Sequence, residues 1–319
     1  MMPAAFDLRQ LDVPVVQAGM GTVAGFELAA AVSEAGGLGT IAGARAEIGA
    51  EVAAARSLTG RPIAVNLLLP FMRRGDVEAA AAADVIVTFW GVPRRLAATT
   101  WIHQCGSVDE AKAAEAAGAD GVIAQGVEAG GHVRGTTPAL ELLDRVRRAV
   151  NIPVLVAGGI VDARGVREAL EAGAAAAVVG TRFLLSEECR AHPEYKQRCL
   201  EASETVLTEL FGLGWPDAPH RVIPNAATRR WLGSDVRGPG WIRVANRMLS
   251  HLANAMPDAA QNRAVRAQLP SWLPYAIAQP PGVDGPAELV DARPLYAGAN
   301  VGRISDVRPA GELVGLLMP

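Results

Sequence analysis

The amino-acid sequence predicts an α/β fold: a (β/α)8 TIM barrel with a smaller, mainly helical C-terminal region. Three observations support this prediction. Short apolar runs alternate with helical patterns between residues 13 and 183, several of the helical patterns end on glycine, and the runs are apolar along their whole length. Runs of that kind are typical of strands buried on both faces of a parallel sheet.

Eight apolar runs are present, which is the strand number of a (β/α)8 barrel. They lie near residues 14, 39, 63, 86, 101, 122, 155 and 177. The helices expected between them cover residues 26–35, 46–58, 76–83, 108–117, 138–150 and 163–172. A doubly wound sheet is the structural alternative. Glycine-rich and polar residues follow many different strands rather than one switch point, which favours the barrel.

The regular alternation ends after Phe183. Residues 187–210 have a helical pattern, whereas residues 212–300 contain many prolines and no strand-helix rhythm. Four of the six tryptophans fall in this second stretch, at positions 215, 231, 241 and 272. We therefore expect three parts: a barrel at 1–206, a helical or irregular region at 207–291 that covers the barrel mouth, and a return to the barrel at 292–319, with a last helix near 310–317.

Composition and charge exclude several classes of function. The chain has 319 residues, 50% of them hydrophobic, and a formal net charge of −3, so nothing indicates binding to nucleic acid or to an anionic membrane. Charged residues break the alanine-rich runs before they reach a membrane-spanning length, and the N-terminus lacks the features of a secretory signal. The cysteines (Cys105, Cys189 and Cys199) lack metal-ligand spacing, which favours reduced thiols in a cytoplasmic enzyme without a bound metal.

Ligands of a barrel bind at the carboxyl ends of the strands, so the residues that follow each predicted strand are candidate site residues. In chain order these are Ala18, Gly19 and Met20; Asn66; Thr88, Phe89 and Trp90; His103 and Gln104; Gln125; Gly158 and Gly159; and Gly180, Thr181 and Arg182.

The glycines after the seventh and eighth strands favour a phosphate site. The stretches AGGI and VGTRF each open a helix and present backbone N–H groups with no side chain in the way. The alternative is that glycine serves only the geometry of a tight turn. The amides Asn66, Gln104 and Gln125 can donate and accept hydrogen bonds, which suits a flavin or a purine, although ordinary loop hydrogen bonding would also explain each of them.

Residues 124–135, AQGVEAGGHVRG, form the loop after the sixth strand. The stretch contains four glycines, more than a turn requires, and a histidine, His132. This combination suggests a backbone that closely approaches a ligand, with a titratable group placed over it. A long surface loop with an incidental histidine is the alternative. Glu128 and Arg134 are interpreted as loop surface.

Three stretches resemble the nitronate monooxygenase family, formerly called 2-nitropropane dioxygenases. They are residues 14–39 (PVVQAGMGTVAGFELAAAVSEAGGLG), 124–135 and 152–183. The resemblance covers essentially the whole barrel, and YAGAN at 296–300 is similar to the family's C-terminal return. It implies an FMN-dependent (β/α)8 barrel.

The resemblance also implies roles for individual residues. His132 would be the catalytic histidine, which binds the substrate or transfers a proton. Gln104 falls where some members place a lysine near the flavin, so a neutral amide would stabilise a reduced anionic flavin less than a cation does. Residues expected to bind FMN are Ala18, Met20, Asn66, Gln104, Gln125, Gly130, Gly131, Ala157, Gly158, Gly159, Gly180 and Thr181, with Gly159, Gly180 and Thr181 at the phosphate.

Two positions depart from the family pattern. Gly19 replaces the proline of the usual QAPM motif, and Trp90 stands where many members carry a variant of SFHFG. We expect Trp90 to add a large apolar wall to the substrate pocket. His103, His192 and the late tryptophans are interpreted as structural.

The leading hypothesis is an FMN-dependent oxidoreductase that oxidises a nitronate or a similar small carbanionic substrate with O2. His132, with a pKa near neutrality, would take or give a proton. The alternative is an NAD(P)H-dependent FMN reductase of a quinone or an enoyl thioester on the same fold. A non-catalytic flavin-binding module ranks third. The physiological substrate, the electron donor and the oligomeric state stay open.

Overall fold

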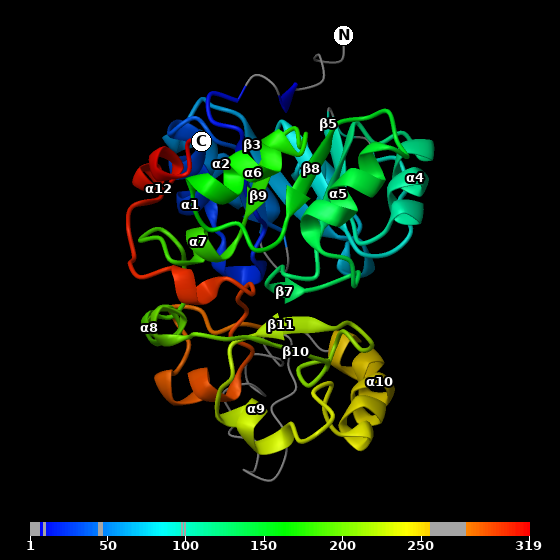
Figure 1. The fold of residues 1–319 in the computed structure, drawn as a ribbon, viewed down its shortest axis with the longest axis vertical. Coiled ribbons are helices and arrows are strands. Elements are labelled where there is room, and N and C mark those ends of the chain that lie inside the picture. The colour runs from blue at the N-terminus through cyan, green and yellow to red at the C-terminus, as the bar shows by residue number, and fades with distance from the viewer. Residues whose placement is uncertain (1–6, 9–10, 44–46, 97, 99, 256–278) are drawn as a thin grey trace.

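The structure is a computed structural model that describes residues 7–8, 11–43, 47–96, 98, 100–255 and 279–319. Eight parallel strands form one sheet in the order β1-β9-β8-β6-β5-β4-β3-β2 (Figure 1). A parallel bridge between Val16 and Leu38 joins the two edges and closes the barrel. The barrel prediction is therefore confirmed, and the doubly wound alternative is wrong. The strands are β1 Val15–Gln17, β2 Gly39–Ala42, β3 Ile63–Leu68, β4 Val85–Phe89, β5 Thr100–Cys105, β6 Gly121–Gln125, β8 Val154–Ala157 and β9 Ala177–Val179.

Helices follow most of the strands and cover the outside of the barrel. Ser107 and Asp162 accept hydrogen bonds from backbone N–H groups in the first turns of α4 and α6, which fixes where these helices begin. Gly36, Gly118 and Gly173 have φ values of +97°, +87° and +90°, so each ends its helix in the left-handed conformation that glycine adopts without strain. The helices are α1 Phe26–Glu34, α2 Ile48–Leu58, α3 Asp76–Ala79, α4 Val108–Ala116, α5 Ala139–Arg147, α6 Ala163–Glu171, α7 Thr181–Leu184 and α12 Ala310–Leu316.

The strands are buried on both faces, which explains their continuous apolar sequence. One set of side chains, including Val16, Val87 and Leu155, packs in a cluster of its own drawn mainly from the strands. Alternate residues such as Val15 and Ile86 pack with the helices in a second, larger cluster. The last helix, α12, packs against α1 and so contributes to the helical layer around the barrel (Figure 1).

A second, smaller sheet lies below the barrel in Figure 1 and is formed by the chain after the barrel strands together with part of the loop after β6. The strands of this sheet are β7 Gly131–His132, β10 Val206–Thr208 and β11 His220–Val222. Their order is β10-β11-β7, and β11 pairs with each of its two neighbours in antiparallel fashion. The helical prediction for residues 187–210 is thus wrong in part. Only α8, Pro193–Glu201, is helical there, because Val206–Thr208 pairs with β11. The remaining elements are η2 Gly21–Val23, η3 Leu69–Phe71, α9 Ala226–Trp231, α10 Gly240–Ala255, η4 Ala287–Ala292 and η5 Val301–Arg303.

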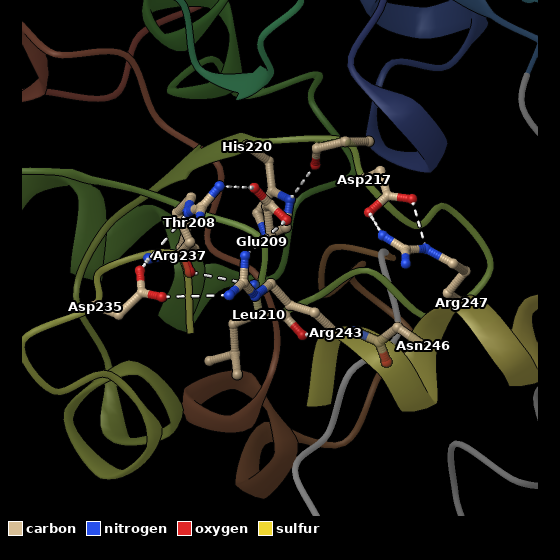
Figure 2. A network of polar contacts seen from close by, with 11 residues as sticks. Thr208, Glu209, Leu210, Asp217, His220, Asp235, Arg237, Arg243, Asn246 and Arg247 are labelled. Carbon is tan, nitrogen blue, oxygen red and sulfur yellow. Dashed lines mark hydrogen bonds and ion pairs between the residues drawn. The ribbon is translucent and has the colours of Figure 1, made fainter. Parts of the chain in front are cut away.

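Ion pairs attach α10 to the loops around the second sheet (Figure 2). Arg247 pairs with Asp217 at 2.6 Å, and Arg243 lies 3.4 Å from Asp235. The Asn246 side chain donates to the backbone carbonyl of Leu210. The charged groups are partly exposed, so each pair contributes little stability and mainly sets the orientation of the helix.

The described helices include none whose length and hydrophobicity would allow it to span a membrane. Trp272, one of the four tryptophans noted in the sequence after residue 212, lies outside the described residues.

Candidate active site

A cavity of about 510 Å³ lies at the carboxyl ends of the barrel strands. Its volume is within the range of small-molecule and cofactor sites. Residues of the second sheet and of the C-terminal segment complete the wall. The site residues predicted from the sequence that line this cavity are Ala18, Met20, Asn66, Gln104, Gln125, Gly130, Gly131, His132, Ala157, Gly158, Gly159, Gly180 and Thr181.

One end of the cavity is formed by glycine backbone. Gly159 follows β8 with φ +71°, and Gly180 directly precedes α7. The backbone N–H groups of Gly159 and Gly180 have no hydrogen-bond partner among the described residues. The Asn300 side chain donates to the Gly159 carbonyl at 2.6 Å, and Gly298 N–H donates to the Thr181 hydroxyl at 2.9 Å. The C-terminal segment therefore holds both loops, and the Thr181 hydroxyl hydrogen is left to donate to a ligand.

The charge on the cavity wall is low. Among the described residues that line it, Arg73 is the only one with a permanent charge, and its side chain is exposed. An anionic group bound deep in the cavity therefore depends on backbone N–H donors. The glycine loops after β8 and β9 supply donors of this kind, so the residues present fit a phosphate group.

The side-chain amides predicted to bind the cofactor differ in whether they already have hydrogen-bond partners. Asn66 and Gln104 line the cavity, and their side chains have no hydrogen-bond partner among the described residues. Gln125, by contrast, donates to the His132 carbonyl at 2.9 Å and accepts from Arg134 N–H at 3.1 Å. Asn66 and Gln104 are available to a heterocycle, whereas Gln125 mainly fixes the loop that carries His132.

Gly19 explains how Asn66 fits. A Cβ atom at position 19 would lie 2.6 Å from the Asn66 Cβ, and real Cβ atoms do not approach that closely. The side chain of Asn66 thus occupies the space that any larger residue at position 19 would need.

His132 lies on β7, not in a free loop as predicted. It pairs with His220 of β11, and Val133 N–H donates to the Pro219 carbonyl. Its Nε2 is buried without a hydrogen-bond partner among the described residues. Burial first, and then the nearby His220, lower the pKa of His132 well below its ordinary value. The expectation of a near-neutral pKa is therefore wrong: the imidazole is neutral because its charged form would lack solvation.

His220 is also neutral, and its hydrogen bonds define its tautomer. Its Nε2 accepts from Phe211 N–H at 3.3 Å, so Nδ1 carries the hydrogen and donates to the Ala218 carbonyl at 3.0 Å. Burial lowers the pKa of His220 to about 4. Two neutral imidazoles with ring centroids 5.2 Å apart thus lie at the junction of the second sheet and the cavity.

The prediction for Trp90 differs from the structure. Trp90 does not line the cavity, and its ring meets that of Trp215 edge-to-face at 5.0 Å. Trp215, interpreted from the sequence as a core residue, lines the wall instead and stacks on His132. The guanidinium of Arg134 lies 4.8 Å from the centroid of the Trp90 ring. Trp90 thus supports the cavity wall from behind.

Two loop residues interpreted as surface have structural roles. The carboxylate of Glu128 accepts a hydrogen bond from Ala139 N–H, the first residue of α5, at 3.0 Å. Arg134 pairs with Glu110 at 2.6 Å. The Glu128 contact lies within its own βα unit, whereas Glu110 belongs to α4 of the preceding unit, so no local sequence pattern signals the Arg134 pair. Phe71, Tyr195 and Tyr296 also line the cavity and were not predicted.

The two histidines interpreted as structural make structural contacts. His103 is buried, and its Nδ1 lies 2.8 Å from the Thr88 hydroxyl, which accepts from the Trp101 indole. His192 accepts from Glu194 N–H at the start of α8. Burial raises the pKa of the Cys105 thiol to about 12, which makes this thiol a poor nucleophile.

A (β/α)8 barrel with glycine loops, amide side chains and a histidine around one cavity at the strand ends has the arrangement of an enzyme active site. The profile of the family described as nitronate monooxygenase matches residues 3–97 and 92–269. The chain belongs to this family, whose members are flavin-dependent oxidoreductases.

The chain is similar to proteins that are named for different activities. The chain is 36% identical to (3aS,4S,5R,7aS)-5-hydroxy-7a-methyl-1-oxo-octahydro-1H-indene-4-carboxyl-CoA dehydrogenase of Mycobacterium tuberculosis, over 73% of this chain and 69% of that protein. It is 34% identical to nitronate monooxygenase of Pseudomonas aeruginosa, over 69% of this chain and 80% of that protein. A solved structure of nitroalkane oxidase from Streptomyces ansochromogenes superposes with a TM-score of 0.73 and 30% identity, covering 97% of this chain and 96% of the other.

Proposed function

We propose that the chain is an FMN-dependent monooxygenase that oxidises a nitronate or a similar small carbanionic substrate with O2. The observation that carries the proposal is the arrangement of the glycine loops, the free amides and His132 around one cavity. Gly159, Gly180 and Thr181 would hold the FMN phosphate through N–H and O–H donors. Asn66 and Gln104 would donate to and accept from the edge of the isoalloxazine ring.

Bound FMN would supply the electron-accepting chemistry, while the chain's own residues bind and orient the substrate. His132 is neutral, so it can donate an N–H hydrogen bond to a substrate oxygen or accept one at its unprotonated nitrogen, whereas its lowered pKa makes it a weak base. An anionic substrate would meet no carboxylate on the described part of the wall, so no like charge repels it. The nitronate and nitroalkane activities of the relatives support this assignment.

The test is to purify the protein, release its cofactor and identify it by mass spectrometry. Oxygen uptake is then measured with propyl-2-nitronate. The proposal predicts FMN near one equivalent per chain and oxygen uptake that depends on the nitronate. A colourless protein that cannot be reconstituted with FMN would refute the cofactor, and FMN without nitronate-driven oxygen uptake would refute the reaction.

A second candidate is the NAD(P)H-dependent reduction of a quinone or an enoyl thioester on the same fold. The similarity to the Mycobacterium tuberculosis dehydrogenase, whose name specifies a CoA thioester, favours it. Arg73, charged and exposed on the cavity wall, suits a substrate with a phosphate-bearing handle. Anaerobic bleaching of the flavin by NADH or NADPH, but not by a nitronate, would select this candidate.

A further inference from the structure

Three aromatic rings meet on one side of the cavity. Trp215 stacks on His132 with ring centroids 3.9 Å apart and planes inclined by 21°, and Phe71 meets Trp215 edge-to-face at 5.0 Å. All three residues line the cavity. We call Phe71, His132 and Trp215 the aromatic wall. It joins η3 of the barrel, β7 and the loop between β10 and β11, so Trp215 bridges the second sheet and the barrel.

The side chain of Trp215 contributes apolar surface to this wall rather than a hydrogen bond. Its indole Nε1 is buried and has no partner among the described residues. The residue is only 8% exposed, although it lines the cavity. A side chain with this placement contacts a ligand through its ring face or edge, and it therefore recognises apolar surface.

The wall is supported from behind by a strained residue. Trp90 has φ +65°, a left-handed conformation that is costly for a bulky side chain, and its ring packs edge-to-face against Trp215. The Arg134 guanidinium lies over the Trp90 ring, 4.8 Å from its centroid, and forms an ion pair with Glu110. Trp215 cannot withdraw without displacing these groups, so the cavity has a fixed limit at this side.

We propose that Trp215 determines substrate specificity by limiting the length of the apolar tail that the active site accepts. The inference rests on the proposed function, since the tail belongs to the carbanionic substrate. In this arrangement the reacting end of the substrate lies toward the flavin site and His132. A short alkyl tail then packs on Trp215 and Phe71, and a longer tail collides with the indole.

The test uses a series of primary nitronates from ethyl to hexyl with the wild type, Trp215→Phe and Trp215→Ala. The wild type is expected to prefer the short members. Trp215→Ala should raise the hexyl-to-ethyl ratio of kcat/KM about tenfold, the gain expected from burying roughly two additional methylene groups. Trp215→Phe keeps a ring and loses no hydrogen bond, so its profile should stay close to that of the wild type. Trp241→Ala, which removes an exposed tryptophan of α10, is the matched control.

A binding measurement separates this proposal from the proposed function. Aliphatic carboxylates are planar anions like nitronates, and their binding is followed by the change in the flavin absorption spectrum. A shift toward longer carboxylates in Trp215→Ala supports the specificity role even if no nitronate turns over. A uniform loss of affinity and activity at every chain length in both Trp215 variants, with unchanged melting temperature, would overturn the proposal.

Discussion

The imidazole of His132 and the indole of Trp215 lie in a near-parallel stack, with ring centroids 3.9 Å apart, although β7 and the loop before β11 are distant in the sequence. The stack joins the candidate catalytic group to the residue that closes its pocket. Because β7 pairs with β11, the second sheet positions both rings. The active site is thus built jointly by the barrel and by the segment that follows it.

Replacing His132 by asparagine should remove catalysis and leave the cofactor in place. The side chain lies on the aromatic wall and not at the glycine loops, so FMN content should match that of the wild type. We expect kcat/KM to fall roughly 10²- to 10³-fold, the usual cost of losing a hydrogen bond aimed at the reacting group, because the asparagine side chain is shorter than the imidazole. His192→Gln, a change of a histidine at the start of α8, is the control. Unchanged turnover in His132→Asn would favour the non-catalytic flavin module.

Replacing Gly159 by alanine should reduce cofactor binding more than stability. Residue 159 lies in the loop proposed to hold the phosphate, and an alanine there would have to adopt φ +71°. Its Cβ would lie 3.0 Å from the side-chain nitrogen of Asn300. Gly75→Ala is a matched control, because Gly75 has φ +95° and a Cβ added there would meet no atom within 4 Å. Both variants should lose about 1–2 kcal/mol of unfolding free energy, but only Gly159→Ala should be purified with less flavin. Equal flavin content in the two variants would contradict the phosphate assignment.

Gly19 and Asn66 should behave as an energetically coupled pair. Gly19→Ala places a Cβ 2.6 Å from the Asn66 Cβ and should cost about 1–3 kcal/mol of unfolding free energy. Asn66→Gly removes the colliding atom, so the double variant should be less destabilised than the sum of the single variants. A double-mutant cycle in urea measures this coupling. Additive effects would show that the contact does not exclude larger residues at position 19.

The barrel could be predicted because its signals are local. Apolar runs, helix caps such as Ser107 and terminal glycines such as Gly173 each act within a few residues. Strand ends of a barrel converge on one face, so a position after a strand predicts a position in the cavity, as it does for Asn66 and Gly159. The boundaries of the three parts at residues 206 and 291 and the cytoplasmic location stay predictions.

The second sheet and the aromatic wall could not be predicted in this way. The two-residue strand β7 exists only because β11, far along the chain, pairs with it. Trp215 resembles any buried tryptophan until its neighbours His132 and Phe71 are known. The pKa of His132 likewise depends on burial between distant segments, which is why its expected near-neutral value was wrong.

Buried neutral histidines should make the protein sensitive to acid. Burial lowers the pKa values of His103 and His220 from 6.5 to about 4. The folded state therefore binds fewer protons than the unfolded state between these values, and stability is complete above pH 6.5 and falls as pH drops toward 4. Each histidine should cost about 2 kcal/mol at pH 5. Urea unfolding at pH 7 and pH 5 measures the loss, and His103→Asn should reduce it. A urea unfolding midpoint that is the same at pH 7 and pH 5 would contradict the lowered pKa values of these histidines.

The most direct test of the central claim is anaerobic reduction of the purified flavoprotein, followed by its absorption spectrum. The cavity, the glycine loops and His132 together predict that propyl-2-nitronate bleaches the bound flavin, that O2 restores it, and that His132→Asn bleaches far more slowly. Bleaching by NADH or NADPH with no response to the nitronate would contradict the proposed reaction and assign the site to a reductase.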